Sequence, residues 1–167
     1  AFKFHSQGNN AKAAEYYKLL IDQGFNDHRV FSNYGVILKN LGKLQEAELS
    51  YHKAIEIKPN FAEGHYNLGN ILIDLGKLQE AELSTRKAIE LHPNFPEAHY
   101  NLGNLLNSLG KLKEAELSTR KAIELKPDYA DAHSNLGIIL KDLGNLQNAE
   151  LSTRKAIQLN PDFAMAH

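Results

Sequence analysis

The sequence Leu41-Gly-Lys-Leu44 returns at Leu75 and Leu109, and Leu143-Gly-Asn-Leu146 repeats it with one change. Successive copies lie 34 residues apart. A fixed period of this length is typical of solenoid proteins, in which each repeat packs only on its neighbours. The period predicts full units at 28–61, 62–95, 96–129 and 130–163, a partial and divergent unit at 1–27, and the start of a further unit at 164–167.

Each unit carries the signals of two helices joined by a tight turn. In unit 62–95, Gly69 lies inside the first helical pattern, where a missing side chain allows a neighbouring helix to approach closely. Gly76 directly follows the last apolar residue, Leu75, and suits a left-handed C-terminal cap. Pro93 ends the second helix because it has no backbone N–H. We therefore expect every unit to be an antiparallel helical hairpin.

The two ends of the chain are less regular. Ala11–Ile21, after Gly8, aligns with a second helix, and Gly24–Asp27 replaces the proline turn. The final residues Met165-Ala166-His167 fall in the register of another first helix. Because the chain also lacks an initiator methionine, we expect it to be a piece of a longer protein.

The repeated residues resemble a known family signature. The pattern is similar to the tetratricopeptide repeat signature at Tyr66-Asn67-Leu68-Gly69, Leu72, Gly76, Ala81, Ala88 and Pro93. The resemblance implies an all-α fold, a right-handed alpha-alpha superhelical solenoid, and a role in binding proteins. The sequence departs from the signature at two positions: its early Trp is replaced by Phe31, His65, His99 and His133, and its second-helix aromatic residue is retained only as Tyr51 and replaced by Thr85, Thr119 and Thr153.

In the family that the sequence resembles, first helices line a concave face, and one column on these helices is invariant within the chain. An amide side chain has two donors and an acceptor, which suits a peptide main chain. Helices packed about 8–10 Å apart would set one amide per about three residues of an extended peptide. The column is similar to the asparagine ladder of O-linked N-acetylglucosamine transferase, although a local bond to a neighbouring turn is the alternative. Its members are Asn33, Asn67, Asn101 and Asn135.

Further residues on the same helices could complete a peptide site. The aromatic rings could stack on ligand side chains, and the acidic rim would favour basic peptides; packing and a solvated surface are the respective alternatives. Additional amides lie about one helical turn after the asparagine column on the same helices. The predicted set is Tyr66, Tyr100, Asn70, Asn104, Glu63, Glu97 and Asp131.

The composition excludes several classes of function. Lys+Arg number 19 and Asp+Glu number 20, so the weak net charge argues against nucleic acid or an anionic membrane as partner. The absence of cysteine removes disulfides and thiolate chemistry and favours the cytoplasm. The column His65, His99 and His133 would be spaced too widely to share a metal. We therefore predict no catalytic residue, no metal site and no cofactor.

Three functions remain compatible with the sequence. The first is a scaffold that binds extended peptide segments of protein partners in the concave groove. The second is a substrate-recruiting arm of a larger transferase. The third is a structural spacer that associates end to end through its last second helix, Leu146–Leu159.

Overall fold

The computed structural model describes residues 9–161. Gly8 and the predicted start of a further unit at 164–167 lie outside the described residues. Within residues 9–161 the chain forms nine α-helices and no strand, which confirms the predicted all-α class. The chain divides into two compact units, residues 1–91 and 92–167.

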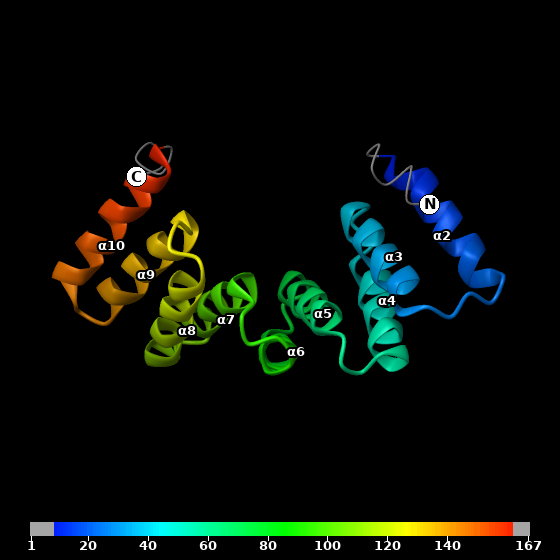
Figure 1. Ribbon diagram of the computed structural model, residues 1–167, viewed down its shortest axis with the longest axis horizontal. Coiled ribbons are helices and arrows are strands. Elements are labelled where there is room, and N and C mark those ends of the chain that lie inside the picture. The colour runs from blue at the N-terminus through cyan, green and yellow to red at the C-terminus, as the bar shows by residue number, and fades with distance from the viewer. Residues whose placement is uncertain (1–8, 162–167) are drawn as a thin grey trace. The chain divides into compact units, whose positions relative to one another are not determined.

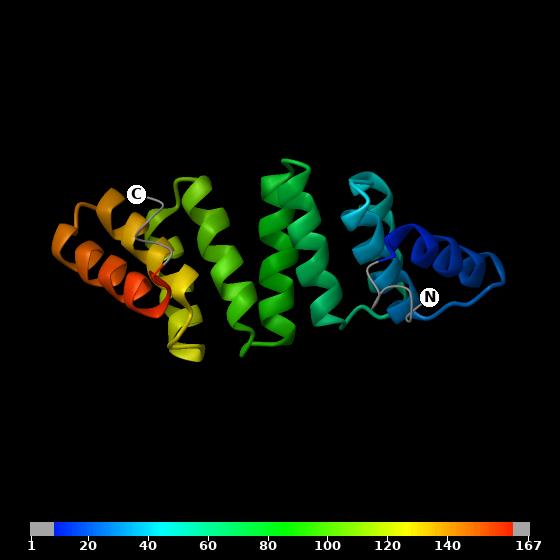
Figure 2. The ribbon, with the colours of Figure 1, turned by 90° about the horizontal axis from the view of Figure 1, so that it is seen from above.

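Unit 1 is built from two complete helical hairpins preceded by one helix. The two helices of each hairpin, α3 with α4 and α5 with α6, lie side by side (Figures 1 and 2). Additional contacts join α2 to α3 and α4 to α5, so the hairpins stack within this unit. The helices are α2 (Asn10–Asp22), α3 (His28–Asn40), α4 (Leu44–Ile57), α5 (Ala62–Asp74) and α6 (Leu78–Leu91).

Unit 2 repeats the same construction with two hairpins. Helix α7 pairs with α8, α9 pairs with α10, and α9 also packs on α8 and α7. The second helices therefore alternate with first helices along the unit. The helices are α7 (Pro96–Ser108), α8 (Leu112–Leu125), α9 (Ala130–Asp142) and α10 (Leu146–Leu159).

The helices begin and end at the glycine and proline positions expected from the sequence. Gly76 has a φ of 74°, in the left-handed region where a side chain would be strained. The N–H of the following residue, Lys77, donates to the carbonyl of Leu72 at 2.8 Å and closes the end of α5. Pro96 begins α7, where its missing N–H costs no intrahelical bond.

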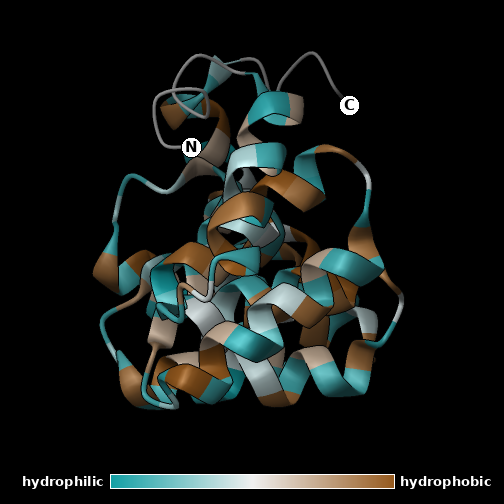
Figure 3. Ribbon diagram, turned by 90° about the vertical axis from the view of Figure 1, so that its right-hand side faces the viewer, coloured by the Kyte–Doolittle hydropathy of each residue, from teal (hydrophilic) through white to brown (hydrophobic). Residues whose placement is uncertain are grey.

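Every hairpin buries a narrow core of aliphatic residues. In unit 1, Leu68 and Leu72 of α5 and Ala81 and Ala88 of α6 are buried. The alanines let the helix axes approach, and the leucines fill the space between them. Figure 3 shows hydrophobic and hydrophilic residues alternating along the helices, as expected when one face packs and the other meets solvent.

The departure from the family signature at the second-helix aromatic position is explained by contacts inside the hairpins. Thr85 is buried against Gly69, where an added Cβ would lie 2.5 Å from the threonine Oγ1. The hydroxyl of Thr85 donates to the carbonyl of Ala81 at 2.8 Å. In the preceding hairpin, the ring of Tyr51 occupies the corresponding place against Gly35. Either a small polar residue or an aromatic ring can therefore fill this position opposite a glycine.

Candidate functional site

The predicted peptide-binding residues lie on the first helices of both units. Asn33 lies on α3 and Asn67 on α5 in unit 1, whereas Asn101 lies on α7 and Asn135 on α9 in unit 2. The amide column is therefore present as two residues in each unit, and each pair has its own surroundings.

Asn135 and Asn33 each bond to the helix that precedes their own hairpin. Asn135 is 9% exposed, and its Nδ2 donates to the hydroxyl of Thr119, 16 residues earlier, at 3.3 Å. Asn33 forms the corresponding side-chain hydrogen bond with Tyr17. Burial raises the pKa of the Tyr17 hydroxyl, and the bond from Asn33 partly offsets that increase. These two amides thus connect one hairpin to the next.

Asn67 has different surroundings although it occupies the same position in its helix. Its side chain is half-buried and makes no hydrogen bond with any residue from 9 to 161. The residue 16 positions earlier is Tyr51, which is 2% exposed and packs against Gly35. Burial raises the pKa of the Tyr51 hydroxyl well above its usual range, and repulsion from the Glu63 carboxylate adds to this effect. The hydrogen-bond donors and the acceptor of the Asn67 amide are therefore available to a ligand.

The acidic residues of the predicted rim differ in exposure. Glu63 and Asp131 are exposed and Glu97 is half-buried. Within residues 9–161, Glu63 forms no ion pair. A different acidic residue of α5, Asp74, is bridged at 2.9 Å by Lys39 of α3, so the two first helices of unit 1 are joined across this face.

The remaining predicted residues are partly engaged in packing. The ring of Tyr100 lies 4.9 Å from the ring of Tyr129, measured between centroids, and Lys126 lies over Tyr129 at 4.7 Å. Tyr66, Asn70 and Asn104 are half-buried, and Tyr66 and Asn70 also have polar or ring partners.

The histidine column has a role that sequence reasoning missed. The ring nitrogens of His65, His99 and His133 lie 2.9, 2.9 and 3.0 Å from the carbonyls of the proline residues six positions earlier. Each bond links the start of a first helix to the turn before it. The recurrence of His six residues after Pro in three units was the available signal, but periodicity does not reveal hydrogen bonds.

Residues 9–161 contain neither a cluster of metal ligands nor a membrane-spanning helix. No three His, Cys, Asp or Glu side chains lie close enough together there to hold a metal ion. No helix in that range has the length and apolar character needed to cross a bilayer.

Family profiles decide the classification of the chain. A profile described as TPR repeat matches residues 35–76, 69–110 and 103–144, and one described as tetratricopeptide repeat matches 130–163. The chain belongs to the tetratricopeptide repeat family. This membership confirms the resemblance seen in the sequence and identifies the protein as a scaffold of the protein-interaction type.

Solved structures have the same tetratricopeptide fold. A crystal structure of MamA is 24% identical with a TM-score of 0.89, and covers 98% of this chain and 95% of its own. MamA from Desulfovibrio magneticus RS-1 is 22% identical with a TM-score of 0.88, covering 96% and 90%. A thermophilic TPR protein of Thermus thermophilus is 19% identical with a TM-score of 0.76, covering 99% and 92%.

A curated relative matches a shorter part of the tetratricopeptide array. The peroxisomal targeting signal receptor of Kluyveromyces lactis is 29% identical over 65 residues, which is 39% of this chain. The match spans only 12% of the receptor's length.

Proposed function

We propose that the first-helix faces of this scaffold bind extended segments of partner proteins through the peptide main chain. The observation that carries the proposal is Asn67, whose half-buried amide has no partner among residues 9–161 and shares α5 with the exposed carboxylate of Glu63. Membership of a protein-interaction family supports the general class of function. The similarity to a peroxisomal targeting signal receptor is compatible with it.

The amide of Asn67 provides the chemistry for main-chain binding. Its Nδ2 can donate to a peptide carbonyl while its Oδ1 accepts from the next peptide N–H, with no requirement on the peptide side chain. A neutral hydrogen bond contributes about 0.5–1.5 kcal/mol net, and ordering a flexible peptide opposes binding. We therefore expect weak binding, with a dissociation constant of about micromolar or higher, and selectivity supplied by the acidic rim.

The first experiment compares two asparagines of the same column. Asn67→Ala should weaken binding of an extended peptide about fivefold to tenfold, because one main-chain hydrogen-bonded rung is lost. Asn135→Ala is the matched control, since the Asn135 amide already bonds Thr119 and is nearly buried. Fluorescence anisotropy with labelled peptides measures both. Equal effects of the two substitutions, or no effect of Asn67→Ala, would contradict main-chain capture at this position.

The second experiment tests the charge of the rim. Glu63→Gln should weaken binding of peptides that contain Lys or Arg and should leave neutral peptides unaffected, since an exposed carboxylate attracts cations without bonding the main chain. The salt dependence of binding should become shallower in the variant. If the Glu63→Gln variant kept the same preference for basic peptides, Glu63 would have no role in peptide binding.

A further inference from the structure

The second helices carry a repeated exposed leucine that hairpin packing does not use. We call these residues the outer leucines; each occupies the same position in its helix. A single exposed leucine is ordinary, but here each unit exposes the same leucine position on both of its complete hairpins. Their exposed fractions are 70% for Leu49 on α4, 71% for Leu83 on α6, 70% for Leu117 on α8 and 59% for Leu151 on α10.

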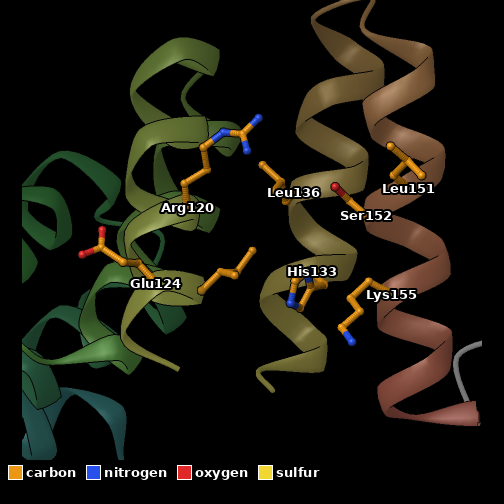
Figure 4. Close-up of a pocket in the computed structure, with 8 residues that line it drawn as sticks. Arg120, Glu124, His133, Leu136, Leu151, Ser152 and Lys155 are labelled. Atoms are coloured by element: carbon orange, nitrogen blue, oxygen red, sulfur yellow. The ribbon is translucent and has the colours of Figure 1, made fainter. Parts of the chain in front are cut away.

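Apolar hollows lie beside the outer leucines. In unit 2 a hollow of about 410 Å³ lies between α8, α9 and α10, with Ile123, Leu136 and Leu151 among its lining residues (Figure 4). In unit 1 a hollow of about 230 Å³ has Ile21, Tyr34 and Leu49 at the corresponding positions. Each unit therefore has both protruding leucines and a recess able to receive one.

Apart from Tyr51 and Ile57 of α4, the second helices α4, α6, α8 and α10 differ only at positions where at least one of them carries a charge, and these differences run in one direction. Counting Lys and Arg against Asp and Glu, the formal charges of α4, α6, α8 and α10 are −2, −1, 0 and +1. Lys113 adds a positive charge in α8, and Asn148 and Gln158 replace two carboxylates in α10. The second-helix face is therefore acidic in unit 1 and neutral to basic in unit 2.

One lysine in unit 2 illustrates the surplus of positive charge. In the earlier second helices a Lys pairs with a Glu three residues later, as in Lys53 with Glu56 at 2.8 Å. Lys155 instead donates to the amide oxygen of Gln158 at 3.1 Å. Lys155 lines the hollow of unit 2 and forms no ion pair within residues 9–161. Its charge remains available to a carboxylate of another molecule.

We propose that a second copy of this chain covers these surfaces, with the α4/α6 face of one copy against the α8/α10 face of the other. The outer leucines of each face enter the hollows of the opposite face, and the acidic and basic surfaces lie together. Each copy supplies one face of each kind, so unlike faces of two copies can pair without bringing like charges together. Neither hollow is lined by Asn67 or Glu63, so the proposed peptide-binding residues are not part of this interface.

Charge reversal with mixing tests the direction of pairing. Glu80→Lys with Glu90→Lys makes both faces positive, and Lys113→Glu with Lys155→Glu makes both faces negative. Sedimentation velocity should find the parent dimeric and each variant alone monomeric, with dimer restored in an equimolar mixture. Failure of the mixture to associate while the parent is dimeric would overturn the pairing of unlike faces.

Leucine substitution tests the apolar part of the interface. Leu83→Ser with Leu117→Ser should abolish the dimer at unchanged helicity. Leu146→Ser is the matched control, because Leu146 is 66% exposed on α10 without being an outer leucine. A parent that is monomeric at its highest soluble concentration would overturn the proposal. So would a dimer that survives loss of the outer leucines but not loss of Leu146, since that pattern indicates end-to-end contact.

Discussion

At the scale of single residues, Asn67 and Asn135 show how one residue type serves two purposes in one column. Asn135 is 9% exposed and donates to Thr119, whereas Asn67 is half-buried without a hydrogen-bond partner among residues 9–161. The difference lies in the contacts of the residue 16 positions earlier. The hydroxyl of Thr119 accepts a hydrogen bond from Asn135, whereas the ring of Tyr51 is packed against Gly35 and forms no hydrogen bond with Asn67.

The same difference predicts unequal effects on stability. Asn135→Ala should lower the free energy of unfolding by about 1 kcal/mol, since a buried hydrogen bond is lost and Thr119 loses a partner. Asn67→Ala should change it by only a few tenths of a kcal/mol. Urea unfolding followed by circular dichroism measures both. Equal destabilisation by the two substitutions would show that Asn67 also has a structural bond.

The contact between Gly69 and Thr85 gives a second prediction at this scale. Gly69→Ala adds a Cβ that would meet Thr85 Oγ1 at 2.5 Å. Overpacking costs about 1–3 kcal/mol, which exceeds the gain of up to about 1 kcal/mol from replacing a helical glycine. We expect net destabilisation in thermal unfolding, largely relieved when Thr85→Ala is added. A stabilised Gly69→Ala variant would mean that the hairpin adjusts without cost.

At the scale of the helix, ends and surface pairs follow local rules. Glu82 and Arg86, four residues apart on α6, form an ion pair at 2.9 Å. Such pairs one turn apart contribute only about 0.3–0.5 kcal/mol each, so they support helices without determining the fold. The capping residues have a larger effect per residue, because they satisfy backbone groups that the helix leaves unbonded.

The cap of α3 can be tested directly. The carboxylate of Asp27 accepts from the backbone N–H of Arg29 at 2.8 Å and pairs with its guanidinium at 2.6 Å. Asp27→Ala should lower the free energy of unfolding by about 1 kcal/mol, as expected for loss of an N-cap. Asn9→Ala at the cap of α2 is a matched control for the cap without the ion pair, since Asn9 is uncharged and accepts from the backbone N–H of Lys12. A larger effect in α2 than in α3 would contradict this assignment.

The same cap predicts a dependence on pH. Hydrogen bonds from Arg29 hold the pKa of Asp27 well below its usual range. A lowered pKa in the folded state means that the charged group stabilises the fold above its unfolded pKa of about 4, and that this stabilisation is lost as pH falls towards the folded pKa. The stability difference between the parent and Asp27→Asn should therefore be constant at neutral pH and shrink in acid. A difference independent of pH would show that charge has no part in the cap.

At the scale of the whole molecule, the two units provide a matched pair of core substitutions. Leu38 in unit 1 and Leu140 in unit 2 are each 1% exposed and occupy the same place in the repeat. Because repeats contact mainly their neighbours, a core cavity should act locally before it acts globally. Leu140→Ala, costing about 2–5 kcal/mol, should accelerate amide hydrogen exchange in α9 and α10 much more than in α3 and α4. Leu38→Ala should show the reverse pattern. Uniform acceleration in both variants would indicate one cooperative body.

Much of the fold could be predicted because its determinants are local and repeated. Gly76 and Pro93 end helices through their own backbone chemistry, and Leu68, Leu72 and Ala81 share a face through helical spacing alone. The candidate site was less predictable, because periodicity placed Asn67 and Asn135 on equivalent positions without showing what each one contacts. The exposure of the outer leucines was not predicted for the same reason. Leu83 follows the inward residue Ala81 by two positions, and spacing along one helix does not show which of its sides the adjacent helices cover.

The amino-acid sequence by itself determined the repeat period, the helical hairpins and the family, since these depend on interactions between residues close together in the chain. Only the tertiary structure decided which asparagine side chain is hydrogen-bonded, which histidine bonds to the carbonyl of the preceding turn and which leucine remains exposed. Those properties depend on side chains from adjacent hairpins, such as Thr119 opposite Asn135 and Tyr51 at the equivalent position before Asn67. A repeated pattern makes the positions equivalent, whereas packing between non-identical neighbours makes their chemistry different.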